Sequence, residues 1–110
     1  MPYLRFKGFE EEFLKRELAA IVELFSHVAA VPRDIVKVES VDITRITDTP
    51  RSLEIYMFPR SQEKHDAIAA VLNELLCDSG YPDVHIFFVL ISPSLYYKNG
   101  EPLQEVSWLA

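Results

Sequence analysis

The chain has 110 residues, of which 49% are hydrophobic and 12% aromatic, and its 17 acidic and 11 basic side chains give a net charge of −6. This composition is typical of a packed globular protein, and folding at this length buries about 65% of the unfolded surface. The acidic balance and the lack of a Lys or Arg run exclude a phosphate-binding stripe, so we expect no nucleic-acid partner. We expect one domain over residues 1–110.

The cysteine count and the hydropathy pattern both indicate a cytoplasmic protein. The single Cys77 has no partner for an internal disulfide, which suits a reducing compartment. No basic segment followed by an apolar one opens the chain, and no apolar run approaches the roughly 18 residues that a membrane span needs. We therefore expect no membrane contact.

Metal and cofactor motifs are missing from the sequence. His27, His65 and His85 fall on three separate predicted elements and lack the spacing of metal ligands. There is also no glycine-rich phosphate loop and no Ser-His-Asp or Cys-His set. We expect no metal and no cofactor.

The first third of the chain predicts a strand followed by a long helix. In residues 2–9, Leu4 and Phe6 alternate with polar neighbours, which is the period of a strand. From Glu10 onward apolar residues recur three or four positions apart until Pro32, which favours one amphipathic helix. The acidic residues 10–12 suit the positive end of its dipole.

A second strand is predicted over residues 35–46, which are rich in β-branched side chains. Val36 and Val38 alternate, and the phase then changes near Ser40 so that Val41 and Ile43 continue the pattern. Such a change of phase indicates a β-bulge.

The second half of the chain predicts the same order of elements. Residues 53–58 alternate as a strand, Ser61 suits a helix N-cap, and Gly80 suits the position after that helix ends. Residues 84–91 are apolar on both faces, which predicts a central strand buried on both sides. Asn99 and Gly100 mark a tight turn within a short C-terminal hairpin or arm.

The two halves therefore read as a tandem repeat. Residues 31–35 correspond to residues 81–84, each giving a proline stop, an aspartate and then a β-branched strand. We predict an α+β fold, a tandem βαβ repeat in which both helices cover one face of a four-stranded mixed sheet. We expect the uncovered sheet face to be apolar and to need a partner.

Pro2 is the most informative single residue. It follows the initiator methionine directly and opens an apolar strand, so removal of Met1 leaves a free secondary amine. An ordinary α-amino group titrates near about 7.7 to 8.0, and an apolar or cationic surround disfavours its charged form. Pro2 is thus a candidate general base at neutral pH.

These features together resemble the tautomerase superfamily, whose members include macrophage migration inhibitory factor and oxalocrotonate tautomerase. The resemblance covers nearly the whole chain, and the double βαβ length is that of the migration-inhibitory-factor type. The ending 96–100 is most similar to a small bacterial family of unknown function within that superfamily. The residues that carry the resemblance are Pro2, Leu4, Phe6, Val31, Pro32, Asp34, Ile35, Val36 and Val38.

The resemblance implies a homotrimer with sheets facing inward and a pocket holding the N-terminal proline at each subunit boundary. It also implies that Pro2 takes a proton α to a carbonyl and returns it elsewhere, which is keto–enol tautomerisation of a small α-keto acid. A cationic donor near the substrate oxygen would stabilise the enolate.

The substrate contacts implied by the resemblance lie mostly at the end of the third strand. Arg60 is the candidate binder of a substrate carboxylate, and Phe58 lines the pocket mouth, while Pro59 replaces the usual glycine and removes a backbone donor. Tyr97 and Arg5 are further candidates for substrate binding. Arg33 lies near the position of a family cation at the second strand, with an ambiguous match.

Two other readings stay open. The first is a trimeric binding or structural protein that keeps the fold without the chemistry. The second is a ferredoxin-like regulatory module, in which the second and third strands pair antiparallel through residues 47–52.

Overall fold

The four main strands form one mixed sheet in the order β2-β1-β3-β4 in the computed structural model, which describes residues 1–103. The strands are β1 (Tyr3–Lys7), β2 (Lys37–Val41), β3 (Ser52–Met57) and β4 (His85–Leu90). β1 is parallel to β2, β3 is parallel to β4, and the central pair β1 and β3 is antiparallel. The tandem βαβ repeat is confirmed.

This strand order is incompatible with the ferredoxin-like alternative. That alternative needs β2 to pair antiparallel with β3, whereas β2 pairs with β1 alone and in parallel. The ferredoxin-like reading is therefore wrong.

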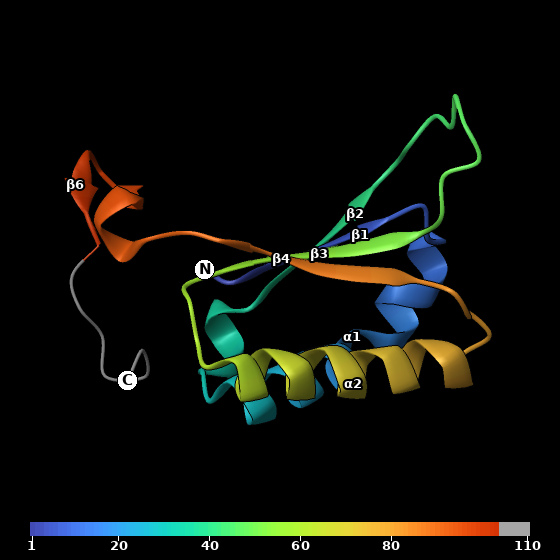
Figure 1. The fold of residues 1–110 in the computed structure, drawn as a ribbon, viewed down its shortest axis with the longest axis horizontal. Helices are drawn as coiled ribbons and strands as arrows, with labels where there is room; N and C mark the ends of the chain where they lie inside the picture. The colour runs from blue at the N-terminus through green and yellow to red at the C-terminus, as the bar shows by residue number, and fades with distance from the viewer. Residues whose placement is uncertain (104–110) are drawn as a thin grey trace.

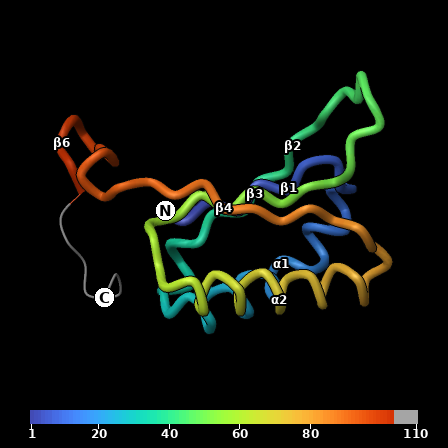
Figure 2. The backbone as a smooth tube through the Cα atoms, in the orientation of Figure 1, coloured from blue at the N-terminus to red at the C-terminus, as the bar shows by residue number. Residues whose placement is uncertain are grey.

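The helices α1 (Glu11–Ala29) and α2 (Gln62–Asp78) lie side by side on one face of the sheet, as Figures 1 and 2 show. Acidic residues occupy the first turn of α1, where the helix dipole favours them. Ser61 caps α2, because its hydroxyl oxygen accepts a hydrogen bond from the backbone N–H of Lys64 at 3.2 Å. Both predicted helices are confirmed.

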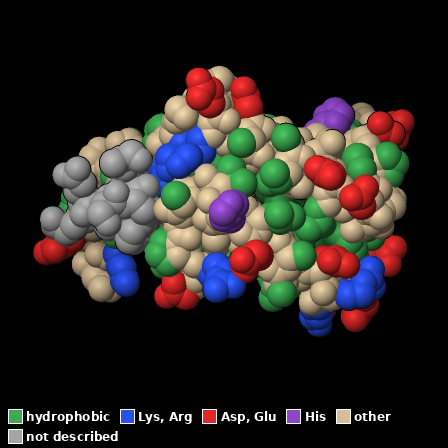
Figure 3. All heavy atoms as spheres, turned by 90° about the horizontal axis from the view of Figure 1, so that it is seen from below, with side chains coloured by type: hydrophobic (Ala, Val, Ile, Leu, Met, Phe, Trp, Pro, Cys, Tyr) green, Lys and Arg blue, Asp and Glu red, His purple; other side chains and the backbone are tan. Residues whose placement is uncertain are grey.

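One hydrophobic core lies between the sheet and the helices. Its fully enclosed side chains come from β1, α1, β3 and α2: Leu4, Phe6, Ile21, Phe25, Leu53, Ile55 and Ile68 each have 0% exposed surface. The outer face of the helix layer mixes charged and apolar side chains (Figure 3). None of the helices among residues 1–103 is long and apolar enough to cross a bilayer.

The predicted extent of the second strand and its bulge are wrong. β2 covers only Lys37–Val41 and pairs with β1 in an unbroken register. The last bond of the pair runs from the Gly8 N–H to the Val41 carbonyl, and Gly8 then turns away with a φ of 85°. The change of phase in the sequence marks the end of the strand, because no neighbouring strand continues past that point.

The prediction that β4 is central and buried on both sides is also wrong. β4 is an edge strand that pairs only with β3. Phe87 and Leu90 are 44% and 50% exposed in the protomer. The apolar sequence of β4 therefore reflects surface that this chain alone leaves uncovered.

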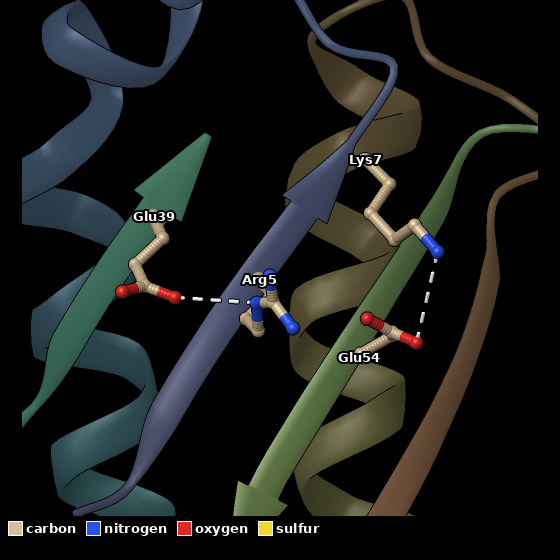
Figure 4. A network of polar contacts seen from close by, with 4 residues as sticks. All are labelled: Arg5, Lys7, Glu39 and Glu54. Atoms are coloured by element: carbon tan, nitrogen blue, oxygen red, sulfur yellow. Dashed lines mark ion pairs between the residues drawn. The ribbon is translucent and has the colours of Figure 1, made fainter. Parts of the chain in front are cut away.

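The sheet face opposite the helices is charged at its centre, which corrects the expectation of an apolar face. Figure 4 shows Arg5 of β1 reaching Glu39 of β2, and Lys7 of β1 reaching Glu54 of β3. The Arg5 Nε to Glu39 Oε1 distance is 3.2 Å, and the Lys7 Nζ to Glu54 Oε2 distance is 3.8 Å. These pairs place opposite charges across neighbouring strands, which favours the observed register.

The C-terminal segment forms an arm that projects beyond the end of the sheet (Figure 1). A short 3₁₀ turn, η2 (Pro93–Leu95), precedes a hairpin of β5 (Tyr97–Lys98) and β6 (Glu101–Pro102). Asn99 and Gly100 both have positive φ, at 55° and 79°, as a two-residue hairpin turn requires. The predicted turn is confirmed.

Two isoleucines give a matched test of this core. Ile55 is 0% exposed and Ile46 is 90% exposed. We expect Ile55→Ala to lower the free energy of unfolding by about 2–5 kcal/mol, because it removes buried methyl groups and leaves a cavity. Ile46→Ala should change it by less than about 0.5 kcal/mol. Urea denaturation measures both, and equal effects would contradict this placement of the core.

Candidate functional site

The N-terminus of the chain lies beside the cavity at the end of the sheet nearest the C-terminal arm. This cavity has a volume of about 550 Å³. Its lining comes from the start of β1, from the segment leading into β2, and from the arm: Met1, Tyr3, Ile35, Lys37, Tyr96, Tyr97, Lys98 and Leu103. Residues far apart in the sequence therefore meet around the chain terminus.

Strand pairing fixes the terminus in this place. Pro2 is buried, and its carbonyl accepts a hydrogen bond from the backbone N–H of Lys37 at 3.0 Å. Tyr3 is the first residue of β1, and it is in register with Lys37 on one side and Tyr56 on the other. The backbone of Pro2 is thus held at the first residue of β2.

The environment of the terminus disfavours a positive charge. Burial lowers the pKa of the Met1 α-amino group below its ordinary value of 8.0, and the nearby charges of Lys37 and Lys98 lower it further. With Met1 attached, the Pro2 nitrogen is an amide and has no basic lone pair. Removal of Met1 converts the Pro2 nitrogen into the terminal amine. This amine is one residue further along the chain than the Met1 α-amino group, which lies at the cavity in the structure.

Tyr96 lines this cavity and also a second one. The Tyr3 and Tyr96 hydroxyl oxygens lie 3.4 Å apart, and both residues line the second cavity of about 250 Å³ together with Arg5 and Glu39. The hydrogen bond to Tyr3, with burial as a smaller cause, raises the pKa of Tyr96 above 10.0. Tyr96 therefore keeps its proton at neutral pH and can donate it in a hydrogen bond.

The predicted site residues are distributed unevenly around these cavities. Tyr97 lines the larger cavity and Arg5 lines the smaller one. Phe58 does not line either cavity but packs edge-to-face against Tyr96, which lines both, with ring centroids 5.9 Å apart. Arg60 and Pro2 line neither of these two cavities. Pro2 is buried, and its neighbour Met1 lines both.

The Arg60 guanidinium is turned toward its own backbone in the protomer. One terminal nitrogen donates to the carbonyls of Phe58 and Pro59, at 3.2 Å and 3.3 Å. Burial lowers the pKa of Arg60 from its ordinary value, although the group stays cationic at neutral pH. A carboxylate would have to compete with these two carbonyls for the guanidinium.

Sequence reasoning missed Lys37 and Lys98. Arg33 is the cation that the sequence places near the second strand, and in the structure it pairs with Glu23 on the surface. Lys37 is the first residue of β2, and its place opposite Tyr3 depends on the register. The available signal was the strand boundary, because a strand beginning at Lys37 instead of Ile35 puts that lysine beside the N-terminus.

Metal ligands are not gathered in the part of the chain that the structure describes. Residues 1–103 contain no group of three or more His, Cys, Asp or Glu side chains placed to hold a metal ion. The cationic side chains at the cavity are those of Lys37 and Lys98, which suit an anionic ligand.

Solved structures of other proteins share this fold. A malonate semialdehyde decarboxylase is 20% identical with a TM-score of 0.68, over 86% of this chain and 88% of that chain. A fused 4-OT asymmetric trimer is 12% identical with a TM-score of 0.76, over 91% and 94% of the two chains. The fold is that of the tautomerase and macrophage migration inhibitory factor superfamily.

Residues 1–102 match DUF1904, a domain of unknown function, and the chain belongs to this family. The DUF1904 domain from Sebaldella termitidis is 28% identical with a TM-score of 0.82, over 91% of this chain and 97% of that chain. No curated protein matches the sequence. The predicted resemblance to a family of unknown function is confirmed, and its fold matches that of tautomerase-superfamily structures.

The cavity lysines make a direct prediction about the terminal amine. Lys37→Gln should raise the pKa of the Met1 α-amino group toward 8.0, because it removes a neighbouring positive charge. The rate of acylation of the N-terminal peptide as a function of pH, read by mass spectrometry, measures this pKa. Lys15→Gln on the exposed face of α1 is the matched control and should leave it unchanged. An identical titration of the Lys37 variant and the wild type would contradict the described geometry.

Proposed function

We propose that this protein is tautomerase-like and interconverts the keto and enol forms of a small α-keto acid. The observation that carries the proposal is the position of the chain terminus in a cavity where burial and two lysines disfavour a protonated amine. An unprotonated amine at neutral pH is what proton abstraction from carbon needs.

The proposed reaction begins after Met1 is removed. The free secondary amine of Pro2 takes a proton from the carbon α to the substrate carbonyl, and the C–H electron pair forms the enolate double bond. The carbonyl oxygen then carries the negative charge, which Lys37 or Lys98 stabilises. Protonated Pro2 returns its proton to the enolate oxygen, and the enol product leaves with the amine restored.

The proposed substrate contacts use the predicted residues. Arg60 binds the carboxylate once its guanidinium leaves the Phe58 and Pro59 carbonyls. Phe58, Tyr97 and Arg5 complete the surface around the substrate. The similar malonate semialdehyde decarboxylase supports a role for the terminal proline, because its structures include a variant in which the first residue, a proline, is replaced by alanine.

We propose a homotrimer as the assembly. The support is the fused 4-OT trimer, which shares the fold, together with the apolar surface that β4 and the arm leave uncovered. Leu95 and Tyr97 of the arm are 70% and 59% exposed. A mass of three protomers in sedimentation equilibrium supports this assembly, and a stable protomer mass contradicts it.

We also propose that the protein is located in the cytoplasm.

The second candidate function is a trimeric binding or structural protein without catalytic activity. Two observations favour it: Pro59 has no backbone N–H to offer a substrate, and Arg60 is already bonded to its own carbonyls. Mass spectrometry of the native protein separates the two candidates. Retention of Met1 leaves no amine on Pro2 and supports the non-catalytic function.

Replacing the proline tests the catalytic proposal. We expect Pro2→Ala to lower kcat/KM for phenylpyruvate by up to about 10²–10⁴, the range for general acid–base catalysis, because the primary amine that it leaves lacks the ring that orients the nitrogen. Enol absorbance follows the reaction, and mass spectrometry confirms that Met1 is absent from each protein. Pro82→Ala is the control, because Pro82 is exposed in the loop between α2 and β4. Equal rates for the wild type and Pro2→Ala would show that the proline ring contributes nothing to the reaction, and would contradict the proposal.

A further inference from the structure

His65 is a buried polar residue in the first turn of α2, with 7% of its surface exposed. Buried polar groups in proteins are almost always hydrogen bonded. The Nε2 atom of His65 accepts a hydrogen bond from the backbone N–H of Arg60, at 3.1 Å. This bond ties α2 to the turn that follows β3.

The bond requires a neutral imidazole. A nitrogen that accepts a hydrogen bond has a lone pair, so the ring proton of neutral His65 is on Nδ1. The Nδ1 atom has no hydrogen-bond partner among residues 1–103, and the ring packs edge-on against Phe88 of β4 at a centroid distance of 4.4 Å. The imidazole therefore has one polar contact, and that contact is to Arg60.

The surroundings of His65 shift its pKa in opposite directions. Burial is the main cause that lowers the pKa of His65 below 6.5, the Arg60 guanidinium lowers it further, and Asp66 on α2 opposes them. The β4 side chain that packs against the ring is the apolar Phe88. His65 is thus neutral at pH 7, as its hydrogen bond needs.

The turn held by His65 leads to the cavity wall. It contains Phe58, Pro59 and Arg60, and the two carbonyls before Arg60 accept from its guanidinium. The Phe58 ring contacts Tyr96, which lines both cavities. A displacement of this turn therefore moves the proposed carboxylate binder and the support of Tyr96 together.

We propose that His65 is a positioning residue that fixes the Phe58–Arg60 turn through its acceptor bond to the Arg60 backbone, and so sets the geometry of substrate binding. The catalytic part of this inference rests on the proposed function. Protonation of His65 removes the acceptor and adds a positive charge beside Arg60, which releases the turn.

The direction of the pH effect follows from the lowered pKa. At pH values above about 6.5, His65 is neutral in both the folded and the unfolded chain, so its contribution to stability is complete. As the pH falls from 6.5 toward the lower folded pKa, the unfolded chain binds the proton first. The stability contributed by neutral His65 is lost across that window.

Hydrogen exchange of the Arg60 amide tests the inference without any substrate. His65→Leu removes the acceptor, and we expect its Arg60 protection factor at pH 7.5 to fall about tenfold, the size of one lost hydrogen bond. His65→Gln offers an amide oxygen near the position of Nε2 and should retain most of the protection. Protection in the wild type should fall below pH 6.5, whereas in His65→Gln it should stay constant.

The Lys64 amide is the internal control, since it bonds to the Ser61 hydroxyl at the same end of α2. Loss of protection at Lys64 as well as Arg60 would mean fraying of the helix and would overturn the inference, as would unchanged Arg60 protection in His65→Leu. If His65→Leu does not fold, the pH dependence in the wild type against His65→Gln decides.

The kinetic part of the test concerns KM. In the phenylpyruvate assay we expect His65→Leu to raise KM with kcat nearly unchanged, and His65→Gln to restore the wild-type KM. An unchanged KM in an active His65→Leu enzyme overturns the role in substrate binding. A wild-type protein without activity contradicts the proposed function instead, and the amide result then reports on the turn alone.

Discussion

The pairing of β1 on both of its edges is the constraint on which the rest of the structure depends. Leu4 and Phe6 have no exposed surface, and the strand bonds to β2 on one side and β3 on the other. Because β1 is the first element, this pairing also immobilises the residue before it. A terminus that is usually free in proteins is here held against the start of β2.

The same constraint determines the electrostatics of the cavity. An amine held at this place loses part of its hydration and lies near Lys37 and Lys98. The protein as a whole has a net charge of −6, whereas the cavity beside the terminus carries the positive charges of Lys37 and Lys98. Fold alone does not decide function, so the proposal that the terminal amine acts as a base rests on this local environment.

The sequence predicted the elements well where local physics decides them. The periodicity of α1, the Ser61 cap and the Asn99–Gly100 turn each depend on neighbours a few residues away, and the structure has all three. The repeat of the two halves predicted the two parallel βαβ units, although not the position of β4 at the edge of the sheet.

What the sequence could not predict depends on pairing between distant segments. β4 is apolar on both faces, yet it lies at the edge of the sheet. Part of its apolar surface is therefore exposed in the single chain. The importance of Lys37 follows from its register with Tyr3, which periodicity does not reveal. Arg60 was predicted from its place in the chain, whereas the direction of its guanidinium depends on two carbonyls of the same turn.

The charge state of the Pro2 nitrogen is the central claim, and a direct titration of that atom tests it best. The protein is labelled with ¹⁵N-proline, removal of Met1 is verified by mass spectrometry, and the ¹⁵N chemical shift of Pro2 is followed from pH 4 to pH 10. We expect a pKa below that of the same amine in the unfolded chain, because burial and the charges of Lys37 and Lys98 disfavour its protonated form. A pKa equal to or above the unfolded value would contradict it.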